Sequence, residues 1–555
     1  MSIPVFGKIR LRGAGFLALF FAGLYLLPLG IRPMMRPDEF RYGEIAREMI
    51  QSGDWIVPRL NGVRYFEKPA LGHQINGCFL LLFGENAFAL RLGPALAVLL
   101  TALAIWMLGA RVSRDPLLPG TAVMLYLTSG LVYGVGTFAV LDSYLVCFLT
   151  LTLGCFFMAY RSNLFRTAAV WLAFAGICAG CAFLVKGFAA LVLPGATAVV
   201  FLLWQKERKK LLIFPWIPLA VMALTVLPWS CAIHRAEPDF WRYFIMEEHV
   251  NRFLSHTYDR KPQPFWYFIP VLLGGIMPGG VLWFAAHRAV NREWLRKDVI
   301  RFCLCAAAVP FVFFSCASCK LGTYILPCFP FLALLTAFAL RRVMRRNVRA
   351  VRKTLSRLIS LWGWIWTVLA AGLLAALCIP SLAALFEGTL LPAALGLLSL
   401  AYGLWLIPAK KKRRWSVMAG GLIPLAVLIS AVLPVSLFGD KMTETGLKAC
   451  LKILPVAKED FVVTGRTEMA AAAWVLKRSD LIVMGKPGEM TYGFRQYPAE
   501  YASRHFQEDS LTEFASKHPG RVVVISTQRN LRKHPFPPGG VTVRHNGMAL
   551  HRPGK

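Results

Sequence analysis

Acidic and basic side chains at the ends of long apolar segments are the residues of this sequence that could do chemistry. Charges within or beside a membrane are energetically costly, so they mark candidate functional sites. The five that we predict to share one membrane interface are Asp38, Arg91, Asp142, Lys186 and Lys320. A cavity that combines carboxylates with cations fits either an enzyme or a transporter.

The stretch RPDEFRYGEIAREM, residues 36–49, carries the first of these charges and predicts a helix. Pro37 suits the first helical position, and Asp38 and Glu39 suit the positive end of the helix dipole. The spacing that follows predicts an amphipathic helix on the outer surface of the membrane. Both carboxylates could serve only the helix start, but the other charges predicted at this interface favour a site at Asp38. Glu39 is expected mainly to cap the helix.

The composition indicates a polytopic membrane protein. Of the 555 residues, 57% are hydrophobic and 16% are charged, and the mean hydropathy is +0.54, which is rare in soluble proteins of this length. The formal net charge is +33, but much of the excess lies in short clusters between apolar runs. That pattern is typical of cytoplasmic loops and not of a nucleic-acid-binding face, so we expect no nucleic-acid partner.

Thirteen apolar segments are candidates to cross a bilayer, which takes about 20 residues each. They lie near 13–32, 87–110, 117–136, 138–160, 167–185, 187–204, 211–233, 265–286, 299–316, 322–340, 359–380, 389–408 and 415–438. Lys and Arg cluster at 206–210, 341–357 and 410–414, on alternate loops. This bias predicts a cytoplasmic N-terminus, with outward-facing loops at 33–86 and 234–264.

The last part of the chain differs from the rest. Short β-rich runs such as DFVVTG and RVVVIST alternate with helical stretches after residue 440. This alternation predicts a small α/β domain on the outer, periplasmic side. We therefore expect a membrane domain over 1–440 and a periplasmic domain over 441–555. The latter carries no nucleotide-binding fingerprint and is expected to be accessory.

The distribution of charge favours an enzyme over a transporter. A transporter would place its charged pairs near the middle of the bilayer and would tend to show repeated halves. Here the predicted number of spans is odd, the charges lie near one interface, and long outer loops hold much of the polarity. An enzyme that acts at the outer leaflet on a lipid-linked substrate fits this pattern better.

Six motifs occur along the membrane domain in a fixed order. They are PDEFRYGEIAREMIQSGDWIVP, RYFEKPALGHQIN, TFAVLDSY, LVKGF, EEHVNRF and KLGTYILP. The series resembles the lipid A 4-amino-4-deoxy-L-arabinose transferases, which belong to the GT-C glycosyltransferases together with the protein O-mannosyltransferases. The resemblance covers most of residues 30–330, and the thirteen-span plan and outward C-terminal domain agree with it.

The resemblance implies a reaction and a location. The donor would be aminoarabinose linked to undecaprenyl phosphate, and the acceptor would be a phosphate of lipid A. Both lipids would lie at the periplasmic face of a bacterial inner membrane, and no nucleotide cofactor would take part. Relatives that transfer other polyprenyl-linked sugars, to lipid A or to protein, keep the donor sugar open as an alternative.

Seven residues match positions that hold roles in this family. The resemblance implies catalytic roles for Asp38, Lys68 and Asp142, substrate binding by Arg252 and Tyr324, and a structural zinc ion on Glu67 and His249. We predict that five more residues bind the substrates: Arg41, Tyr42, Tyr65, Lys186 and Lys320.

The chemistry gives these roles physical sense. A polyprenyl phosphate gains negative charge as the sugar–oxygen bond breaks, and Lys68 and Arg252, with Lys320, would stabilise it. The acceptor phosphate is already largely ionised near neutral pH, since its second pKa is about 6. Asp38 is therefore expected to orient the nucleophile or to hold the ammonium of the sugar. A hydroxyl acceptor would instead require a general base.

Overall fold

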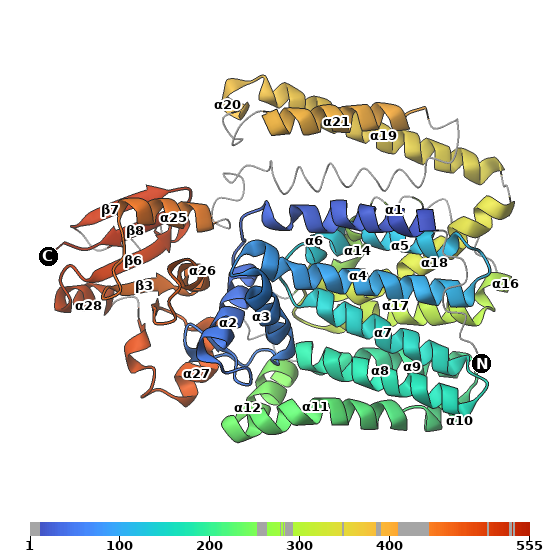
Figure 1. The fold of residues 1–555 in the computed structure, drawn as a ribbon, viewed down its shortest axis with the longest axis horizontal. Helices are drawn as coiled ribbons and strands as arrows, with labels where there is room; N and C mark the ends of the chain where they lie inside the picture. The colour runs from blue at the N-terminus through green and yellow to red at the C-terminus, as the bar shows by residue number, and fades with distance from the viewer. Residues whose placement is uncertain are drawn as a thin grey trace.

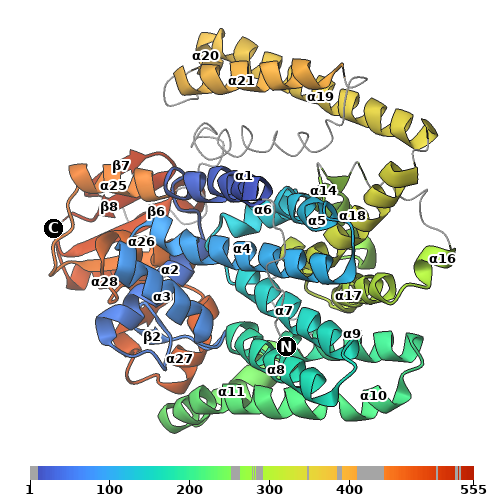
Figure 2. The same cartoon turned by 45° about the vertical axis from the view of Figure 1, so that its right-hand side comes forward.

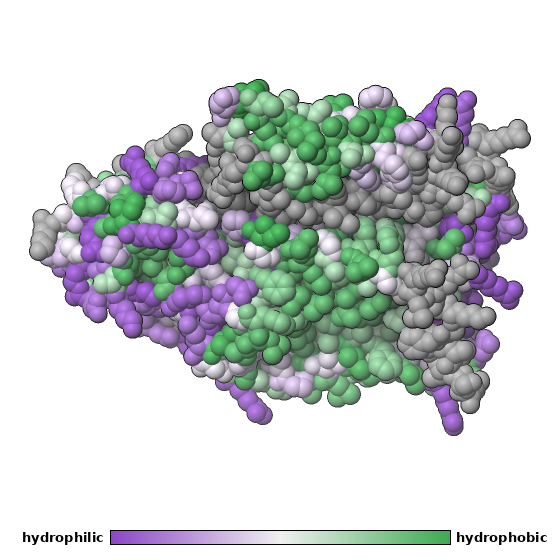
Figure 3. All heavy atoms as spheres, turned by 45° about the horizontal axis from the view of Figure 1, so that its top comes forward, coloured by the Kyte–Doolittle hydropathy of each residue, from purple (hydrophilic) through white to green (hydrophobic). Residues whose placement is uncertain are grey.

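The computed structural model describes residues 11–251, 263–277, 279–280, 282, 292–346, 349–383, 390–408, 443–507, 510–531, 536 and 539–554. A bundle of long helices forms one part of the molecule, and a mixed α/β domain forms the other (Figure 1). Hydrophobic side chains gather over the helices, whereas hydrophilic ones dominate the C-terminal domain (Figure 3). The predicted fold class, a polytopic helical membrane protein with a C-terminal α/β domain, is confirmed.

Seven helices of the described residues are long and apolar enough to cross a membrane. They are α4 (Ala87–Val112), α7 (Asp142–Tyr160), α8 (Phe165–Lys186), α11 (Trp216–Ala236) with α10 (Arg208–Ile213) before it, α17 (Asp298–Cys316), α18 (Phe329–Arg346) with η6 (Gly322–Cys328) before it, and α19 (Arg349–Leu377). An eighth span results if α5 (Leu118–Leu127) and α6 (Gly130–Gly136), which meet at 66°, are counted together.

Shorter apolar helices occupy several of the other predicted spans. They include α1 (Leu11–Phe21) continued by η1 (Ala22–Leu26) and η2 (Leu27–Gly30), α9 (Ala189–Trp204), η4 (Phe265–Tyr267) with α14 (Phe268–Gly275), and α21 (Leu390–Leu406). The segment predicted at 415–438 lies outside the described residues, so the count of thirteen stays a prediction. Helices α19 and α21 run side by side along one flank of the bundle (Figures 1 and 2).

The two loops that the sequence predicts to face outward, called the outward loops below, contain helices at one end of the bundle in their described parts, 33–86 and 234–251. Helices α2 (Asp38–Ser52) and α3 (Leu71–Phe83) lie between the bundle and the C-terminal domain (Figures 1 and 2). The other loop forms α12 (Phe240–Arg242) and the π-helical turn η3 (Tyr243–Asn251). The cationic α10 and the short helix α16 (Arg292–Leu295) lie toward the opposite end (Figure 1).

Helix α2 begins at Asp38, one residue after the predicted start at Pro37, and it is buried and does not lie on the surface of the molecule. Most of its residues from Glu39 to Met49 are inaccessible to solvent. Gly43 shows why: a Cβ atom there would come within 2.9 Å of Leu90 on α4 and 3.2 Å of Trp474 in the C-terminal domain. The helix is packed from both sides, so the prediction of a surface helix is wrong.

The C-terminal domain contains one six-stranded sheet in the order β5-β4-β3-β6-β8-β7. The strands are β3 (Phe461–Gly465), β4 (Ile482–Met484), β5 (His505–Phe506), β6 (Val522–Thr527), β7 (Val541–His545) and β8 (Met548–Arg552). The first four in this list are parallel, and the last two add an antiparallel hairpin. The helices are α25 (Thr443–Ile453), α26 (Arg466–Leu476), α27 (Thr491–Gln496), α28 (Leu511–Lys517) and α29 (Gln528–Leu531).

Glu39 connects its own helix, α2, with the first predicted span and with α4. Its carboxylate is fully buried and accepts hydrogen bonds from the guanidinium groups of Arg32 and Arg91 at 2.6 to 3.2 Å. The backbone N–H groups of Met35 and Ala139 also donate to it, at 2.8 and 3.1 Å. The prediction that Glu39 mainly caps α2 is wrong, because its partners lie outside that helix.

Arg91 belongs to this network and not to a functional cavity. It also donates to the backbone carbonyls of Leu29, Arg32 and Pro33, so five hydrogen bonds hold its guanidinium. Burial alone would raise the pKa of Glu39, but Arg91 and Arg32 lower it to about 2. The carboxylate therefore stays ionised, and the assignment of Arg91 to a functional site is wrong.

We predict that Glu39→Ala strongly destabilises the folded chain. It leaves two buried arginines without their anion, a change that costs about 3–5 kcal/mol in comparable buried pairs. Because the pKa of Glu39 is lowered from 4.5, its contribution is complete above that pH and is lost only as pH falls toward 2. Unfolding of the detergent-solubilised chain at neutral pH measures the loss.

Glu513→Gln is the matched control for this prediction. Glu513 pairs with Lys517 on an exposed helix of the C-terminal domain, where an ion pair contributes little. The control should unfold as the wild type does. Equal stability of Glu39→Ala and the control would refute the role assigned to the buried network.

Candidate active site

A cavity of about 670 Å³ opens where the outward loops meet the ends of α7 and α8. Its polar wall combines side chains from seven parts of the chain. The charged and polar residues among its lining are Asp38, Arg41, Tyr42, Glu67, Lys68, Asp142, Lys186, Glu248, His249, Thr323, Tyr324 and Glu489. The rest of the lining is largely apolar, as a groove for a lipid chain requires.

The ends of two membrane helices place one ion pair on the cavity wall. Asp142 is the first residue of α7, and Lys186 is the last residue of α8. The Nζ of Lys186 donates to Oδ1 of Asp142 at 2.7 Å and lies 5.8 Å from the ring centre of Tyr324. A carboxylate at a helix start and a lysine at a helix end are both favoured by the helix dipole.

The start of α2 supplies a second charged group. Arg41, one helical turn after Asp38, donates to its carboxylate, so the two side chains share one face of α2. Its other terminal nitrogen donates to Oε1 of Glu489 at 2.7 Å. Burial alone would lower the pKa of Arg41, but nearby tyrosines and these two carboxylates raise it. A permanent cation therefore lies between two acids.

A third group comes from the loop between α2 and α3. The Nζ of Lys68 donates to the backbone carbonyl of Glu67 at 2.7 Å and lies 3.9 Å from Oε2 of Glu248. Tyr65 is fully buried behind the wall, and its hydroxyl lies 3.4 Å from Oε2 of Glu67. Tyr65 is thus placed to hold Glu67 and not to line the cavity.

Nine of the twelve predicted site residues line this cavity. They are Asp38, Arg41, Tyr42, Glu67, Lys68, Asp142, Lys186, His249 and Tyr324. Tyr65 and Lys320 do not line it, and Arg252 lies outside the described residues. The ammonium of Lys320 donates to the backbone carbonyls of Gln263 and Ala317, at 3.0 and 2.5 Å, which gives it a structural contact.

Two lining carboxylates were absent from the sequence prediction. Glu248 precedes His249 in the motif EEHVNRF, so its neighbour was a signal that could have identified it. Glu489 comes from the C-terminal domain, more than 160 residues after the last predicted site residue, and no motif marked it. The expectation that this domain is merely accessory is therefore wrong, because it supplies part of the cavity wall.

Glu67 and His249 are partly suited to a metal ion. The Nδ1 of His249 lies 2.8 Å from the carbonyl oxygen of Phe244, as in metal-binding histidines that donate their second N–H to an acceptor. Zinc usually takes at least three protein ligands. Among the residues that the structure describes, no group of three or more His, Cys, Asp or Glu side chains could hold a metal. The described donors alone are incomplete for zinc.

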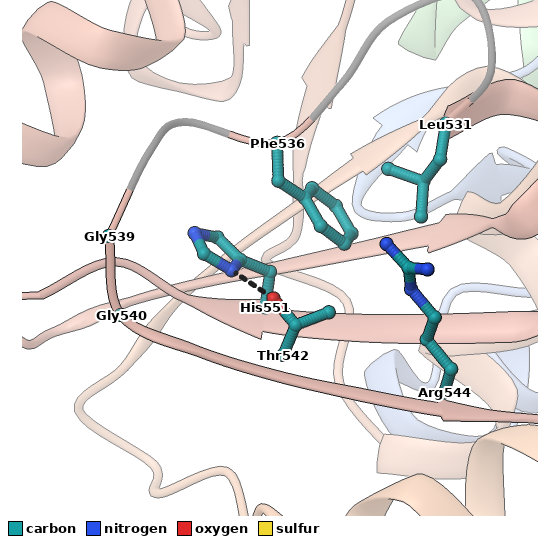
Figure 4. Close-up of a pocket in the computed structure, with 7 residues that line it drawn as sticks. All are labelled: Leu531, Phe536, Gly539, Gly540, Thr542, Arg544 and His551. Carbon is teal, nitrogen blue, oxygen red and sulfur yellow. Dashed lines mark hydrogen bonds between the residues drawn. The ribbon is translucent and has the colours of Figure 1, made fainter.

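A second cavity of about 310 Å³ lies in the C-terminal domain, against the β7–β8 hairpin. Figure 4 shows His551 beside Phe536 and Thr542, with Arg544 at the far side. The Nδ1 of His551 lies 2.8 Å from the hydroxyl of Thr542. Burial lowers the pKa of His551, so its ring is neutral. None of the predicted site residues lines this second cavity.

Comparison with known proteins identifies the family. The chain is 37% identical, over 87% of its own length and 87% of the relative's, to an undecaprenyl phosphate-alpha-4-amino-4-deoxy-L-arabinose arabinosyl transferase of Edwardsiella ictaluri. It is 33% identical, over 94% of both chains, to the undecaprenyl phosphate-alpha-4-amino-4-deoxy-L-arabinose arabinosyl transferase 2 of Proteus mirabilis. The chain belongs to this arabinosyltransferase family. The predicted family and the choice of an enzyme over a transporter are confirmed, and the chain is a glycosyltransferase.

Two sequence families and a solved structure agree with the arabinosyltransferase assignment. Residues 12–244 match the dolichyl-phosphate-mannose-protein mannosyltransferase family, and residues 450–552 match the C-terminal domain of arabinosyl transferase ArnT. The crystal structure of ArnT from Cupriavidus metallidurans bound to undecaprenyl phosphate superposes with a TM-score of 0.76. At 22% identity, over 97% of this chain and 98% of that one, the likeness shows a shared fold.

Proposed function

We propose that this chain transfers 4-amino-4-deoxy-L-arabinose from undecaprenyl phosphate to a phosphate of lipid A. Its arabinosyltransferase relatives carry that sugar and that lipid carrier in their names. The observation that carries the proposal is one cavity that joins charged groups for phosphate and sugar to an apolar lining for a polyprenyl chain.

The balance of charge in the cavity favours an amino sugar. Five carboxylates line the described wall, at Asp38, Glu67, Asp142, Glu248 and Glu489. Three basic side chains accompany them, at Arg41, Lys68 and Lys186. A uronate donor would need extra cations, whereas an aminoarabinose brings its own ammonium to a wall that is rich in acids. The excess of carboxylates supports the aminoarabinose over the uronate.

The cations fit the phosphate groups of the reaction. As the anomeric carbon leaves the phosphate oxygen of undecaprenyl phosphate, negative charge develops on that oxygen. Lys68 and Lys186 would stabilise this charge in a partly dry cavity, where such electrostatic effects are strong. The lipid A phosphate oxygen then bonds to the same carbon. Since that phosphate is already ionised, no proton needs to be removed.

Asp38 acts in this scheme as an orienting group. Its carboxylate accepts from Arg41 and is therefore held in one position. Arg41 can bind the acceptor phosphate with the part of its guanidinium not engaged by Asp38 and Glu489, or Asp38 can hold the ammonium of the sugar. Either role places a reactant and leaves proton transfer aside, which agrees with the chemistry of an ionised acceptor.

We further propose that the cavity faces the periplasm at a bacterial inner membrane. The basic loops of the sequence predict a cytoplasmic side. The cationic α10, and α16, which Arg296 and Lys297 follow, lie toward the end of the bundle away from α2 and the C-terminal domain (Figure 1). The N-terminus would then be cytoplasmic, and the C-terminal domain would be periplasmic.

We also propose that Glu67 and His249 are two ligands of a structural zinc ion. Further ligands, such as water, would complete the site. The ion would hold the two outward loops together, because Glu67 follows α2 and His249 lies in η3.

Mass spectrometry of lipid A tests the proposed function. The host is a Gram-negative strain that lacks its own transferase but still makes the aminoarabinose lipid. We expect the wild type and the surface control Glu513→Ala to add an aminopentose to lipid A, and Asp38→Ala to add none. Unmodified lipid A in membranes that contain the wild-type chain would contradict the proposed donor or acceptor.

Two lysines that look alike in the sequence should differ in ligand binding. Lys68→Gln should weaken binding of undecaprenyl phosphate about 10- to 100-fold, the effect of losing one charged hydrogen bond. Lys320→Gln should leave this affinity unchanged at temperatures where the chain is folded, because its ammonium binds backbone carbonyls. Titration of the detergent-solubilised variants with the lipid measures both. Equal losses would contradict the assigned placement.

Metal analysis of the purified chain tests the zinc ion. We expect about one zinc per wild-type chain, as a single structural site requires. His249→Ala should lose it, and the control His505→Ala, in the C-terminal domain, should keep it. A wild type without zinc, purified in the absence of chelators, would refute the site.

A further inference from the structure

The sheet of the C-terminal domain has a reversal of strand order, a feature at which open α/β folds bind ligands. From β3 the chain first adds β4 and β5 on one side and later adds β6 on the other. The direction of strand order thus reverses between β3 and β6. In such sheets ligands bind beside the carboxyl ends of the strands at this reversal. The question is what occupies that place here.

A buried acid, Glu468, lies where the strand order reverses. It lies in the first turn of α26, directly after β3, and its side chain is 0% exposed. Oε1 accepts hydrogen bonds from the hydroxyl of Thr527 at 3.1 Å and from the side-chain amide of Asn530 at 2.9 Å. Oε2 accepts from the hydroxyl of Thr467 at 2.7 Å. The carboxylate of Glu468 is therefore fixed in position beside the ends of β3 and β6.

Glu468 also binds an arginine from the membrane domain. Arg36 donates from a terminal nitrogen to Oε1 of Glu468 at 2.9 Å, and its side chain is only 9% exposed. In sequence Arg36 stands two residues before Asp38 and directly before Pro37. The carboxyl edge of the sheet thus binds the chain just before α2, through Glu468 and Arg36.

A second contact from the same edge lies just beyond Asp38. Glu489 follows β4 and pairs with Arg41 at 2.7 Å. Arg36, two positions before Asp38, and Arg41, three positions after it, are therefore each bound by an acid. These acids, Glu468 and Glu489, follow the neighbouring parallel strands β3 and β4. Asp38 itself contacts Arg41 and lines the cavity. The carboxyl edge of the sheet therefore holds the chain on both sides of Asp38.

We propose that Glu468 is a positioning residue for the transfer reaction, which it serves by fixing Asp38 through Arg36. It does not touch the cavity, so it acts only through the start of α2. At the place where an open α/β domain would bind a ligand, the C-terminal domain instead binds Arg36 and so supports the active site. This inference rests on the proposed function for its kinetic effect, but not for its structural effect.

Glu468→Gln and Arg36→Ala test the proposal by kinetics with purified chain, undecaprenyl-phosphate-linked aminoarabinose and lipid A. Each should lower kcat about 10- to 100-fold, because small displacements of a positioned group have effects of this size. The KM for the donor should change less than about threefold, since the donor phosphate is held by other residues. The double variant should be no slower than the slower single variant, because the two side chains act as one unit.

Glu85→Gln is the matched control. Glu85 pairs with Lys477 at 2.5 Å and joins the same two domains, but Lys477 stands at the other end of α26 from Glu468. The control should keep the wild-type kcat. If Glu85→Gln lowers kcat as much as Glu468→Gln, the pair at Arg36 only holds the domains together, and the proposal is overturned.

Hydrogen exchange of residues 36–42 gives a readout that needs no activity. Amides there should exchange at least about tenfold faster in Glu468→Gln than in the wild type, whereas Glu85→Gln should leave them unchanged. Wild-type exchange rates in Glu468→Gln would overturn the proposal whatever the enzyme transfers. An inactive wild type with faster exchange only in Glu468→Gln would refute the proposed substrates and uphold the positioning.

Discussion

The buried carboxylate of Glu39 is the interaction on which the arrangement of this molecule depends. It joins the end of the first span, through Arg32, to α4, through Arg91, and it also binds the backbone at Ala139. Buried charges cost free energy unless each has a partner, so these groups hold one another in a single arrangement. Glu39 is the neighbour of Asp38, and Ala139 precedes Asp142 by three residues. One structural acid therefore fixes the positions of two acids in the cavity.

The cavity that results has contributions from parts of the chain that serve different physical needs. The ends of α7 and α8 supply a pair of opposite charges at the membrane interface, where the cost of burying them is moderate. The two outward loops supply the remaining cations and the candidate metal ligands. The C-terminal domain supplies Glu489 and closes over α2. A lipid-linked substrate would meet an apolar groove at one place and a dense array of charges at another.

The C-terminal domain contributes to the wall of the candidate active site, as the membrane helices do, because Glu489 lines the cavity. Beyond the contacts at the start of α2, it is joined to the outward loops by Arg64, which pairs with Glu500, and by Tyr497, whose hydroxyl donates to Glu237 at 2.5 Å. The buried amide of Asn61 exchanges two hydrogen bonds with the backbone of Leu481. Many polar contacts of this kind specify one docking geometry, because each donor needs its own acceptor. This explains how a sheet domain can place a carboxylate in a membrane cavity.

The sequence by itself determined the class of fold, the family and most of the cavity. Apolar segments and basic loops follow from the solvent properties of the bilayer, which act on each segment separately. Motifs around Asp38, Lys68 and Asp142 are local in the chain, so they could be recognised without a structure.

Only the tertiary structure decided which charges serve the cavity and which serve the fold. Arg91 and Lys320 resemble Lys186 in sequence, since all three are cations at the ends of apolar segments, yet the first two bind buried structural partners. The role of a charge depends on the groups that lie within a few ångströms of it. The partner of Glu489 is Arg41, which is 448 residues away in the sequence. Such pairings are set by packing between distant segments, which no local pattern records.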